Sequence, residues 1–476
     1  MTAPFLIVFR ISLRFSLFLG LFLRAWHYFR TLSVWQDEAA LIHNVLQLNS
    51  SEMFGPLLLD QAAPPLFLLL IRTVVHSFGD SVLVLRLVPF ISACMAMILF
   101  TDLCRRSLRV EAARIAVLLF AVSDSLLWHA SELKPYSSDV LMAVLVPWLV
   151  MRTNRFSISH SAGVGILLAP LCIWFSFPAC FVFGGWLVAL LPRFLSSSAC
   201  ARDRVAYLGF VLSVSISFIL LALGPIHEQR TGELVDYWKS AFPDWQKPWF
   251  VPLWILLQTA EVIRYAIMPW GNFLAPLFAV GAWQLWRRDA QFRTLFLAIL
   301  MPMLAVLVAS LLGKYPYSAS RLEAFLIGTV CITMGVGFVA VLEWCAQARI
   351  RHGLAWFMVL WLVAPCGFAI YQLLVPTVRP ASDDVAKYIL QERKPGELVL
   401  SNHWDYLYYL RAIPPEEKHF WFGGRTGSWG TISGQRVWII HTNSIRPTKC
   451  PVEVPREYTI TREIHFTMTT CYLAER

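Results

Sequence analysis

The chain has 476 residues, of which 57% are hydrophobic and only 15% are charged. Soluble domains carry about a quarter charged residues, so the composition excludes an ordinary soluble protein and predicts a polytopic α-helical membrane protein. The net charge is +10, but the arginines fall in short runs between apolar segments and not on one basic face. This distribution argues against nucleic-acid binding and is typical of cytoplasmic loops under the positive-inside rule.

Apolar segments of about 17 to 25 residues can span a bilayer, and eleven are predicted to do so here. They are 6–26, 82–104, 110–128, 137–151, 157–176, 178–194, 205–224, 270–286, 293–313, 322–345 and 354–375. The first resembles a secretory signal, but it lacks a small-residue cleavage site and continues past the usual apolar length. An uncleaved first span is therefore predicted.

The apolar segment 64–79 is predicted to lie in the membrane interface as an amphipathic helix. It is short, begins with Pro64 and Pro65, and contains Arg72 and His76. If it does not cross, the later arginine clusters all fall on one side of the membrane, as the positive-inside rule requires. These clusters are Arg105/Arg106/Arg109, Arg152/Arg155, Arg193/Arg202/Arg204, Arg287/Arg288/Arg293 and Arg349/Arg351. The segment 251–268 is interpreted in the same way.

The opposite side of the membrane then receives four polar segments and the C-terminal tail. The segments are about 27–81, 129–139, about 225–269 and 313–321. The tail has a helical pattern at 383–393 and strand patterns at 397–401 and 436–442. We therefore predict a transmembrane domain at 1–375 and a small external α/β domain at 376–476.

The ten cysteines show no CxxC spacing, so neither a zinc site nor a redox motif is indicated. Cys450 and Cys471 lie in the polar tail, where they could form a disulfide if the tail faces an oxidising compartment. His43 and His129 have no partner at metal-ligand spacing, so solvated or core histidines are favoured over a metal site.

Ionisable and aromatic residues gather in the external segments, which makes them functional candidates. A carboxylate there could take a proton from an attacking hydroxyl, while cations stabilise a phosphate leaving group. The candidates are Asp37 and Glu38 in the first segment, Glu132, Lys134 and Tyr136 in the second, and Tyr315, Tyr317 and Arg321 in the last.

Each candidate also has a structural interpretation. The carboxylates Asp37 and Glu38 could simply stabilise the start of a helix, where negative charge meets the positive end of the dipole. Lys134 and Arg321 could be interface anchors, and the tyrosines could belong to an aromatic belt.

Three stretches in the first 150 residues, in this order and spacing, resemble the GT-C membrane glycosyltransferases. They are "LFLRAWHYFRTLSVWQDEAAL", "APPLFLLLIRTVVHSFGDSVLVLRLVPFISA" and "HASELKPYSSDVLMA". The resemblance is to the branch that contains protein O-mannosyltransferases and aminoarabinose transferases. It continues weakly through "KYPYSASR". The aminoarabinose branch would have Glu-Lys-Pro before the second interfacial helix, whereas this chain has Gln61-Ala62-Ala63-Pro64, which argues against that particular substrate.

The resemblance implies an inverting transferase that takes a sugar from a polyprenyl-phosphate donor and passes it to a lipid, glycan or protein hydroxyl. Asp37 occupies the position of the catalytic base, with Glu38 beside it, and Lys134 and Arg321 match the residues that hold the lipid phosphate. No cofactor is implied; a divalent metal could bind through the carboxylates, but no cluster requires one. The expected location is a bacterial inner membrane, with the site and tail in the periplasm.

Three other functions remain open from the sequence. A transporter or flippase would also need charges near the membrane, but such proteins commonly show repeated halves, and no internal repeat is seen. A polymerase or ligase that uses diphosphate-linked donors would share the chemistry without the early Asp-Glu segment. A non-catalytic scaffold would leave the carboxylates as helix-start residues only.

Overall fold

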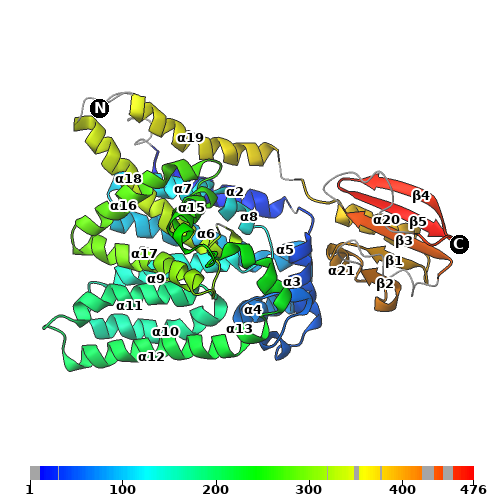
Figure 1. Ribbon diagram of the computed structural model, residues 1–476, viewed down its shortest axis with the longest axis horizontal. Helices are drawn as coiled ribbons and strands as arrows, with labels where there is room; N and C mark the ends of the chain where they lie inside the picture. The colour runs from blue at the N-terminus through cyan, green and yellow to red at the C-terminus, as the bar shows by residue number, and fades with distance from the viewer. Residues whose placement is uncertain are drawn as a thin grey trace. The chain divides into compact units, whose positions relative to one another are not determined.

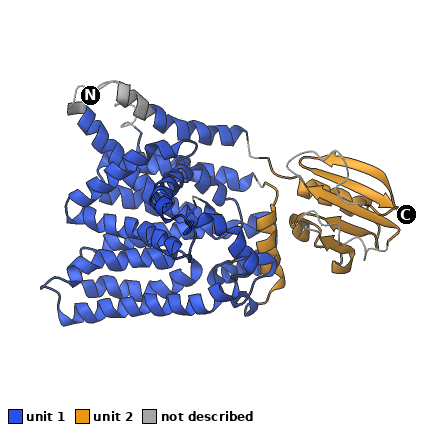
Figure 2. Cartoon of the chain, viewed as in Figure 1, with its two compact units in different colours: residues 1–30, 50–376 blue, residues 31–49, 377–476 orange. Residues whose placement is uncertain are grey.

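The computed structural model describes residues 11–30, 32–318, 320–347, 353–375, 378–420, 434–442 and 454–476. The chain forms two compact units (Figure 2), one of residues 1–30 and 50–376 and the other of residues 31–49 and 377–476. The segment that carries Asp37 therefore groups with the C-terminal tail, which a division of the chain at 375/376 does not anticipate.

The first unit is helical throughout its described part (Figure 1). Its α-helices are α2 (Leu13–Phe29), α4 (Pro65–Phe78), α5 (Val82–Leu85), α6 (Leu87–Ser107), α7 (Val110–Val122), α8 (Asp124–His129), α9 (Tyr136–Thr153), α10 (Ile158–Phe175), α11 (Ala179–Phe194), α12 (Ala201–Leu223), α13 (Pro225–Glu228), α14 (Gly232–Tyr237), α15 (Val251–Ala266), α16 (Ala275–Arg287), α17 (Ala290–Leu311), α18 (Ile327–Gln347) and α19 (Gly353–Leu374). Short 3-10 turns are η1 (Glu52–Phe54), η2 (Leu58–Asp60), η3 (Lys239–Ala241), η4 (Pro248–Phe250), η5 (Gly271–Leu274) and η6 (Arg321–Leu326).

Every predicted span coincides with one or two of these helices, but not all of the helices are long enough to cross a bilayer. Among the described residues, five are both long and apolar enough: Leu87–Ser107, Ile158–Phe175, Ala201–Glu228, Ala290–Leu311 and Arg321–Cys345. A pair bent by 113°, Pro248–Ala266 with Gly271–Arg287, could form a sixth. The chain is thus an integral membrane protein, while the number of eleven spans stays a prediction.

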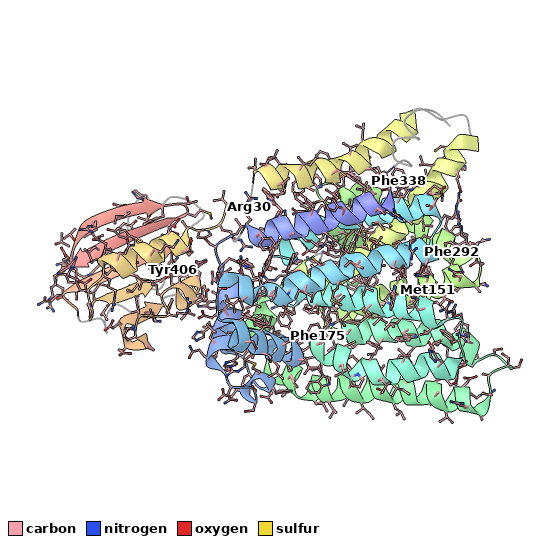
Figure 3. The ribbon with its side chains drawn as sticks, turned by 180° about the vertical axis from the view of Figure 1, so that it is seen from behind. Arg30, Met151, Phe175, Phe292, Phe338 and Tyr406 are labelled. Carbon is pink, nitrogen blue, oxygen red and sulfur yellow. The ribbon has the colours of Figure 1, made fainter. Side chains whose placement is uncertain are left out.

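The two ends of the helical unit can be followed in Figure 3. Arg30 and Phe175, near the ends of α2 and α10, lie toward one end, and Met151 and Phe292, near the end of α9 and the start of α17, lie toward the other. The alternation agrees with helices that run back and forth through a layer. The arginine-rich connections next to Met151 and Phe292 therefore lie at the end opposite Arg30.

Side-chain contacts join the arginine-rich connections to one another. Gln291 Nε2 donates to the carbonyl oxygen of Arg106 at 3.4 Å, and Arg193 Nη1 donates to that of Asn154 at 3.0 Å. Arg109 pairs with Glu343 near the end of α18. The described clusters therefore share one end of the unit, as the positive-inside pattern predicted; Arg349 and Arg351 lie outside the described residues.

Two glycines allow a close helix contact in this unit. A Cβ on Gly281 of α16 would lie 1.9 Å from the carbonyl oxygen of Thr333, and one on Gly337 of α18 would lie 2.0 Å from that of Leu277. Small residues let membrane helices approach at the backbone. The two helices pack along this contact.

Gly281→Ala is expected to destabilise the helical unit by about 1 to 3 kcal/mol, because the added methyl group forces α16 and α18 apart. Gly184→Ala is the matched control, since a Cβ at that helical glycine meets nothing within 4 Å. Thermal unfolding of the two variants in detergent compares them. Equal melting temperatures would contradict the role of this contact.

The second unit contains a five-stranded sheet of order β2-β1-β3-β5-β4. The strands are β1 (Leu398–Ser401), β2 (Lys418–Phe420), β3 (Arg436–Thr442), β4 (Thr459–Phe466) and β5 (Thr469–Glu475); the helices are α3 (Gln36–Gln47), α20 (Ser382–Glu392) and α21 (Asp405–Tyr409), with the 3-10 turn η7 (Pro415–Glu417). β1 pairs in parallel with β2 and β3, while β5 runs antiparallel to β3 and β4.

Residues 437–442 of β3 are all buried, so this sheet is covered on both faces. Trp438 and Ile440 pack with Val385 and Ile389 of α20, whereas Val437 and its alternate neighbours pack on the other face. The helix and both strands predicted in the tail are present within one residue of their expected bounds.

Cys471 lies buried in β5, where burial raises the pKa of its thiol to about 12. Cys450 lies outside the described residues, so the disulfide between them stays a prediction.

Candidate active site

The turn between α8 and α9 carries three of the predicted site residues and is anchored on both sides. Ser137 Oγ donates to the carbonyl oxygen of His129 at 2.8 Å and closes the turn. Ser123 and Ser125 donate to the carbonyl oxygens of Ala266 and Tyr265 at 2.9 and 2.8 Å, which fixes α8 against the end of α15. The helix that leads into the predicted external segment 129–139 is therefore in direct contact with the predicted external segment 225–269.

Glu132 is buried in this turn and bonds to neighbouring side chains. Its Oε1 lies 2.6 Å from His129 Nδ1, and its Oε2 accepts a hydrogen bond from Trp128 Nε1 at 3.0 Å. His129 Nε2 lies 2.6 Å from the hydroxyl of Tyr265, and the ring of Tyr136 packs on the imidazole with centroids 4.8 Å apart. His129 is thus a core histidine that links the turn to α15. No local sequence pattern marks Tyr265 as a partner of His129, because the bond spans 136 residues.

Tyr265→Phe is expected to lower the free energy of unfolding by about 1 to 3 kcal/mol, because it leaves a buried imidazole nitrogen without the hydroxyl it bonds to. Tyr237→Phe is the matched control, since Tyr237 is 67% exposed. Thermal unfolding in detergent measures both. A loss in the control as large as in Tyr265→Phe would contradict a specific role for this bond.

Lys134 lies beside Gln61, which precedes α4. Lys134 Nζ donates to Gln61 Oε1 at 2.7 Å, and the lysine is only 6% exposed. Gln61 Nε2 in turn donates to the carbonyl oxygen of Leu59 at 3.0 Å. Gln61 is the residue at which the chain departs from the Glu-Lys-Pro pattern, so an amide stands next to the predicted phosphate-binding lysine.

The backbone before Gln61 adopts an uncommon conformation. Leu59 and Asp60 have φ angles of 61° and 50°, in the left-handed region that non-glycine residues rarely occupy. The segment is held from the other side by Gln229, whose Oε1 accepts a hydrogen bond from the Ala63 backbone at 3.0 Å. Strained backbone of this kind persists where surrounding contacts impose it, and it clusters at functional sites.

The turn before η6 carries Tyr315 and Tyr317 and leads directly into Arg321. The hydroxyl of Tyr315 donates to the carbonyl oxygen of Leu322 at 2.9 Å, and that of Tyr317 lies 3.1 Å from Thr259 Oγ1. Burial raises the pKa of both phenols well above the usual range, so each stays protonated as a hydrogen-bond donor. These hydroxyls therefore hold the turn together.

Arg321 begins η6 and lies over the ring of Trp238, with its guanidinium carbon 6.0 Å from the ring centroid. Ser320 and Glu323 form a capping box around it. Because η6 packs against α9, the turn that carries Arg321 and the helix that follows Lys134 belong to one contact region.

Asp37 and Glu38 occupy the first turn of α3 in the second unit. Asp37 is partly exposed, whereas Glu38 is fully buried, and its Oε2 lies 3.6 Å from Arg379 Nη1. The structure thus contains the helix start that the dipole interpretation expected, which is compatible with a catalytic Asp37. Arg379 was not recognised from the sequence, since it lies just after the last apolar segment with no motif around it.

Among the residues that the structure describes, no group of three or more His, Cys, Asp and Glu side chains could hold a metal ion. The expectation of metal-independent chemistry is neither supported nor opposed by this observation and stays a proposal.

The architecture and the polar turns define a class of fold, and comparison with solved structures identifies it. No protein-family model and no curated protein matches the sequence. The structure resembles that of the aminoarabinose transferase ArnT from Cupriavidus metallidurans in the apo state, with 14% identity, a TM-score of 0.53, and 94% of this chain and 95% of ArnT covered. ArnT bound to undecaprenyl phosphate gives the same identity and TM-score, with 99% and 98% covered.

The Archaeoglobus fulgidus oligosaccharyltransferase, in complex with Zn and sulfate, matches at 13% identity over 86% of this chain and 62% of its own length, with a TM-score of 0.49. That score is too low to carry an argument. The likeness to ArnT over nearly the whole of both chains confirms the GT-C fold that the sequence resemblance predicted. At 14% identity it shows the fold and not the reaction.

Proposed function

We propose that this protein is an inverting glycosyltransferase that uses a polyprenyl-phosphate-linked sugar. The observation that carries the proposal is the buried Lys134, which Gln61 holds in the turn before α9. The fold resembles that of ArnT, which has been solved with undecaprenyl phosphate bound. A buried ammonium suits a phosphate oxygen, because hydrogen bonds between charged groups are roughly twice as strong as neutral ones.

In the proposed reaction the donor phosphate is bound by Lys134 and Arg321. Asp37 takes the proton of an acceptor hydroxyl, and the hydroxyl oxygen attacks the anomeric carbon from the side opposite the phosphate. The bond between that carbon and the phosphate oxygen breaks, and its electron pair leaves with the polyprenyl phosphate. The cations stabilise the charge that develops on this leaving group, and the configuration at the anomeric carbon inverts.

The remaining candidates are proposed to act mainly by placing these three. Glu132 and Tyr136 contact His129 and so hold the turn that presents Lys134. Tyr315 and Tyr317 hold the turn that presents Arg321 through their hydroxyl groups. These four residues are also proposed to contact the donor directly.

Chain connectivity is compatible with Asp37 reaching the donor. Asp37 follows Arg30 by seven residues, and an extended chain rises at most about 3.6 Å per residue. The separation between their Cα atoms is therefore at most about 25 Å. Arg30 lies at the same end of the helical unit as Phe175 (Figure 3). Ser176, which follows Phe175, bonds to Asp139 near the start of α9 at 2.7 Å. The start of α9, just after Lys134, therefore lies at this end too.

We place the protein in a bacterial inner membrane, with the site and the sheet-containing domain in the periplasm. The gathering of the described arginine clusters at the other end of the helical unit supports this orientation. A transporter or flippase is not favoured, because the fold matches that of ArnT.

Transfer from radiolabelled undecaprenyl-phosphate sugars, measured in membranes that contain the protein, tests the proposal. The acceptor would be identified as the glycoconjugate that disappears from native cells when Asp37 is replaced by Asn. If the Asp37→Asn cells keep an unchanged set of glycoconjugates and no labelled sugar is transferred by the wild type, the proposed function is wrong.

Chelation with EDTA is expected to leave transfer unchanged, since the proposed chemistry uses only side-chain cations. The transfer assay before and after chelation measures this. A loss that a divalent ion restores would show that a metal takes part.

A further inference from the structure

The C-terminal part of the second unit holds the segment that leads into α3. Arg379 Nη1 donates to the carbonyl oxygen of Ser33 at 2.8 Å, and Ser33 Oγ donates to Asp383 Oδ1 at 3.2 Å. The backbone N–H of Val34 donates to the hydroxyl of Tyr409 at 2.8 Å. The three partners come from the stretch before α20, from α20 itself and from α21. The backbone just before Asp37 is thus fixed by residues far away in the sequence.

The ion pair of Glu38 and Arg379 adds a second attachment inside the helix. Both side chains are almost fully buried, at 0% and 5% exposure. A buried ion pair is weak evidence for stability, because removing two charges from water costs about as much as their attraction returns. We therefore interpret this ion pair as a contact that selects one arrangement of the chain and not as a source of stability.

Glu38 and Asp37 point in different directions because consecutive residues of an α-helix are rotated by about 100°. Arg379 holds Glu38 against the domain, whereas Asp37, on the neighbouring side of the turn, remains partly exposed. One side of the first turn of α3 is therefore an anchor, and the neighbouring side presents a carboxylate.

We propose that Arg379 is a positioning residue for Asp37. By binding the Ser33 carbonyl group and Glu38 together, it sets the orientation of the first turn of α3 and hence of the carboxylate. The C-terminal domain is then part of the catalytic apparatus and not only a module that recruits the acceptor. The inference rests on the proposed function, since it assigns Arg379 to the base of that reaction.

Arg379→Met removes both bonds while keeping an apolar side chain of similar length. It is expected to lower kcat by about tenfold, because a misplaced base loses the geometry of attack, and to leave KM for the donor unchanged. Arg379→Lys should recover part of the rate.

Arg462→Met is the matched control, since Arg462 forms an ion pair with Glu392 at 2.9 Å in the same domain but is 46% exposed. Its kcat should not change.

A double-mutant cycle separates positioning from general destabilisation. In an Asp37→Asn background, Arg379→Met should cause no further loss, because its effect passes through Asp37. An equal tenfold loss in both backgrounds would overturn the inference. Full activity of Asp37→Asn alone would instead reject Asp37 as the base, and with it the proposed mechanism.

Hydrogen exchange of residues 32–47 gives a readout independent of turnover. Exchange should be faster in Arg379→Met than in wild type and unchanged in Arg462→Met. Tyr409→Phe, which removes the bond to Val34 but leaves Arg379 in place, should show a smaller effect of the same kind if Arg379→Met fails to fold. Faster exchange with an unchanged kcat would overturn the positioning role.

Discussion

Asp37→Asn should lower the rate of sugar transfer by about 10²- to 10⁴-fold, the range that a positioned general base contributes. Asparagine keeps the size and the hydrogen-bonding capacity of the side chain but cannot accept the proton of the acceptor hydroxyl. KM for the donor should change little, because the phosphate is bound by Lys134 and Arg321 in the proposed site. Steady-state transfer from a radiolabelled polyprenyl-phosphate sugar measures both constants.

Asp384→Asn is the control for this substitution. Asp384 also lies in the first turn of a helix of the same unit, but its side chain is 63% exposed and pairs only at the surface with Lys387 at 3.5 Å. Its replacement should leave transfer unchanged. Near wild-type turnover by Asp37→Asn would remove Asp37 as the base, and the adjacent carboxylate would then be tested.

Glu38 is a poor first choice for that test because its replacement has a structural consequence. Glu38→Gln leaves the buried guanidinium of Arg379 without its carboxylate, and breaking one partner of a buried ion pair costs about 3 to 5 kcal/mol. A loss of transfer in Glu38→Gln would therefore mix chemistry with unfolding. The partial exposure of Asp37 and the burial of Glu38 support our proposal that Asp37 is the reacting group and Glu38 the anchor.

The parts of the fold that depend on local pattern could be predicted from the sequence. Apolar runs located the membrane helices, and a run of β-branched and aromatic residues located β3 (Arg436–Thr442) within the tail. The number of spans could not be predicted, because apolarity does not distinguish a spanning helix from a shorter buried one. α7 has only 13 residues, and ten of them are buried, although its sequence is as apolar as that of a span.

The residues of the proposed site were inferred from the sequence, but their bonding partners were not. Lys134 and Asp37 stand in short stretches whose order resembles a known family, whereas their partners depend on long-range folding. The bond from Lys134 to Gln61 spans 73 residues, and that from Arg379 to Ser33 spans 346. No local pattern marks such partners, so neither the grouping of residues 31–49 with the tail nor the role of Arg379 could be read from one sequence.

Lys134→Met should lower kcat/KM for the lipid-linked donor by about ten- to hundredfold, the equivalent of losing one hydrogen bond between charged groups. Methionine fills a similar volume but carries no charge for the phosphate. Part of the loss should appear in KM and part in kcat, because the phosphate is charged in the bound donor and gains further charge as it leaves. Lys134→Arg should retain more activity than Lys134→Met, since it keeps the charge.

Gln61→Glu provides a sharper version of the same test, because it leaves Lys134 in place. It would set a carboxylate where an amide oxygen now lies 2.7 Å from Lys134 Nζ. That carboxylate would compete with the donor phosphate for the ammonium, so KM for the donor should rise, whereas Gln61→Ala should have a smaller effect.

Lys247→Met, at a lysine whose side chain is 64% exposed, is the control for the loss of positive charge in Lys134→Met. If Lys134→Met and Lys247→Met bind and turn over the donor equally well, Lys134 does not hold the phosphate, and the proposed site must be moved.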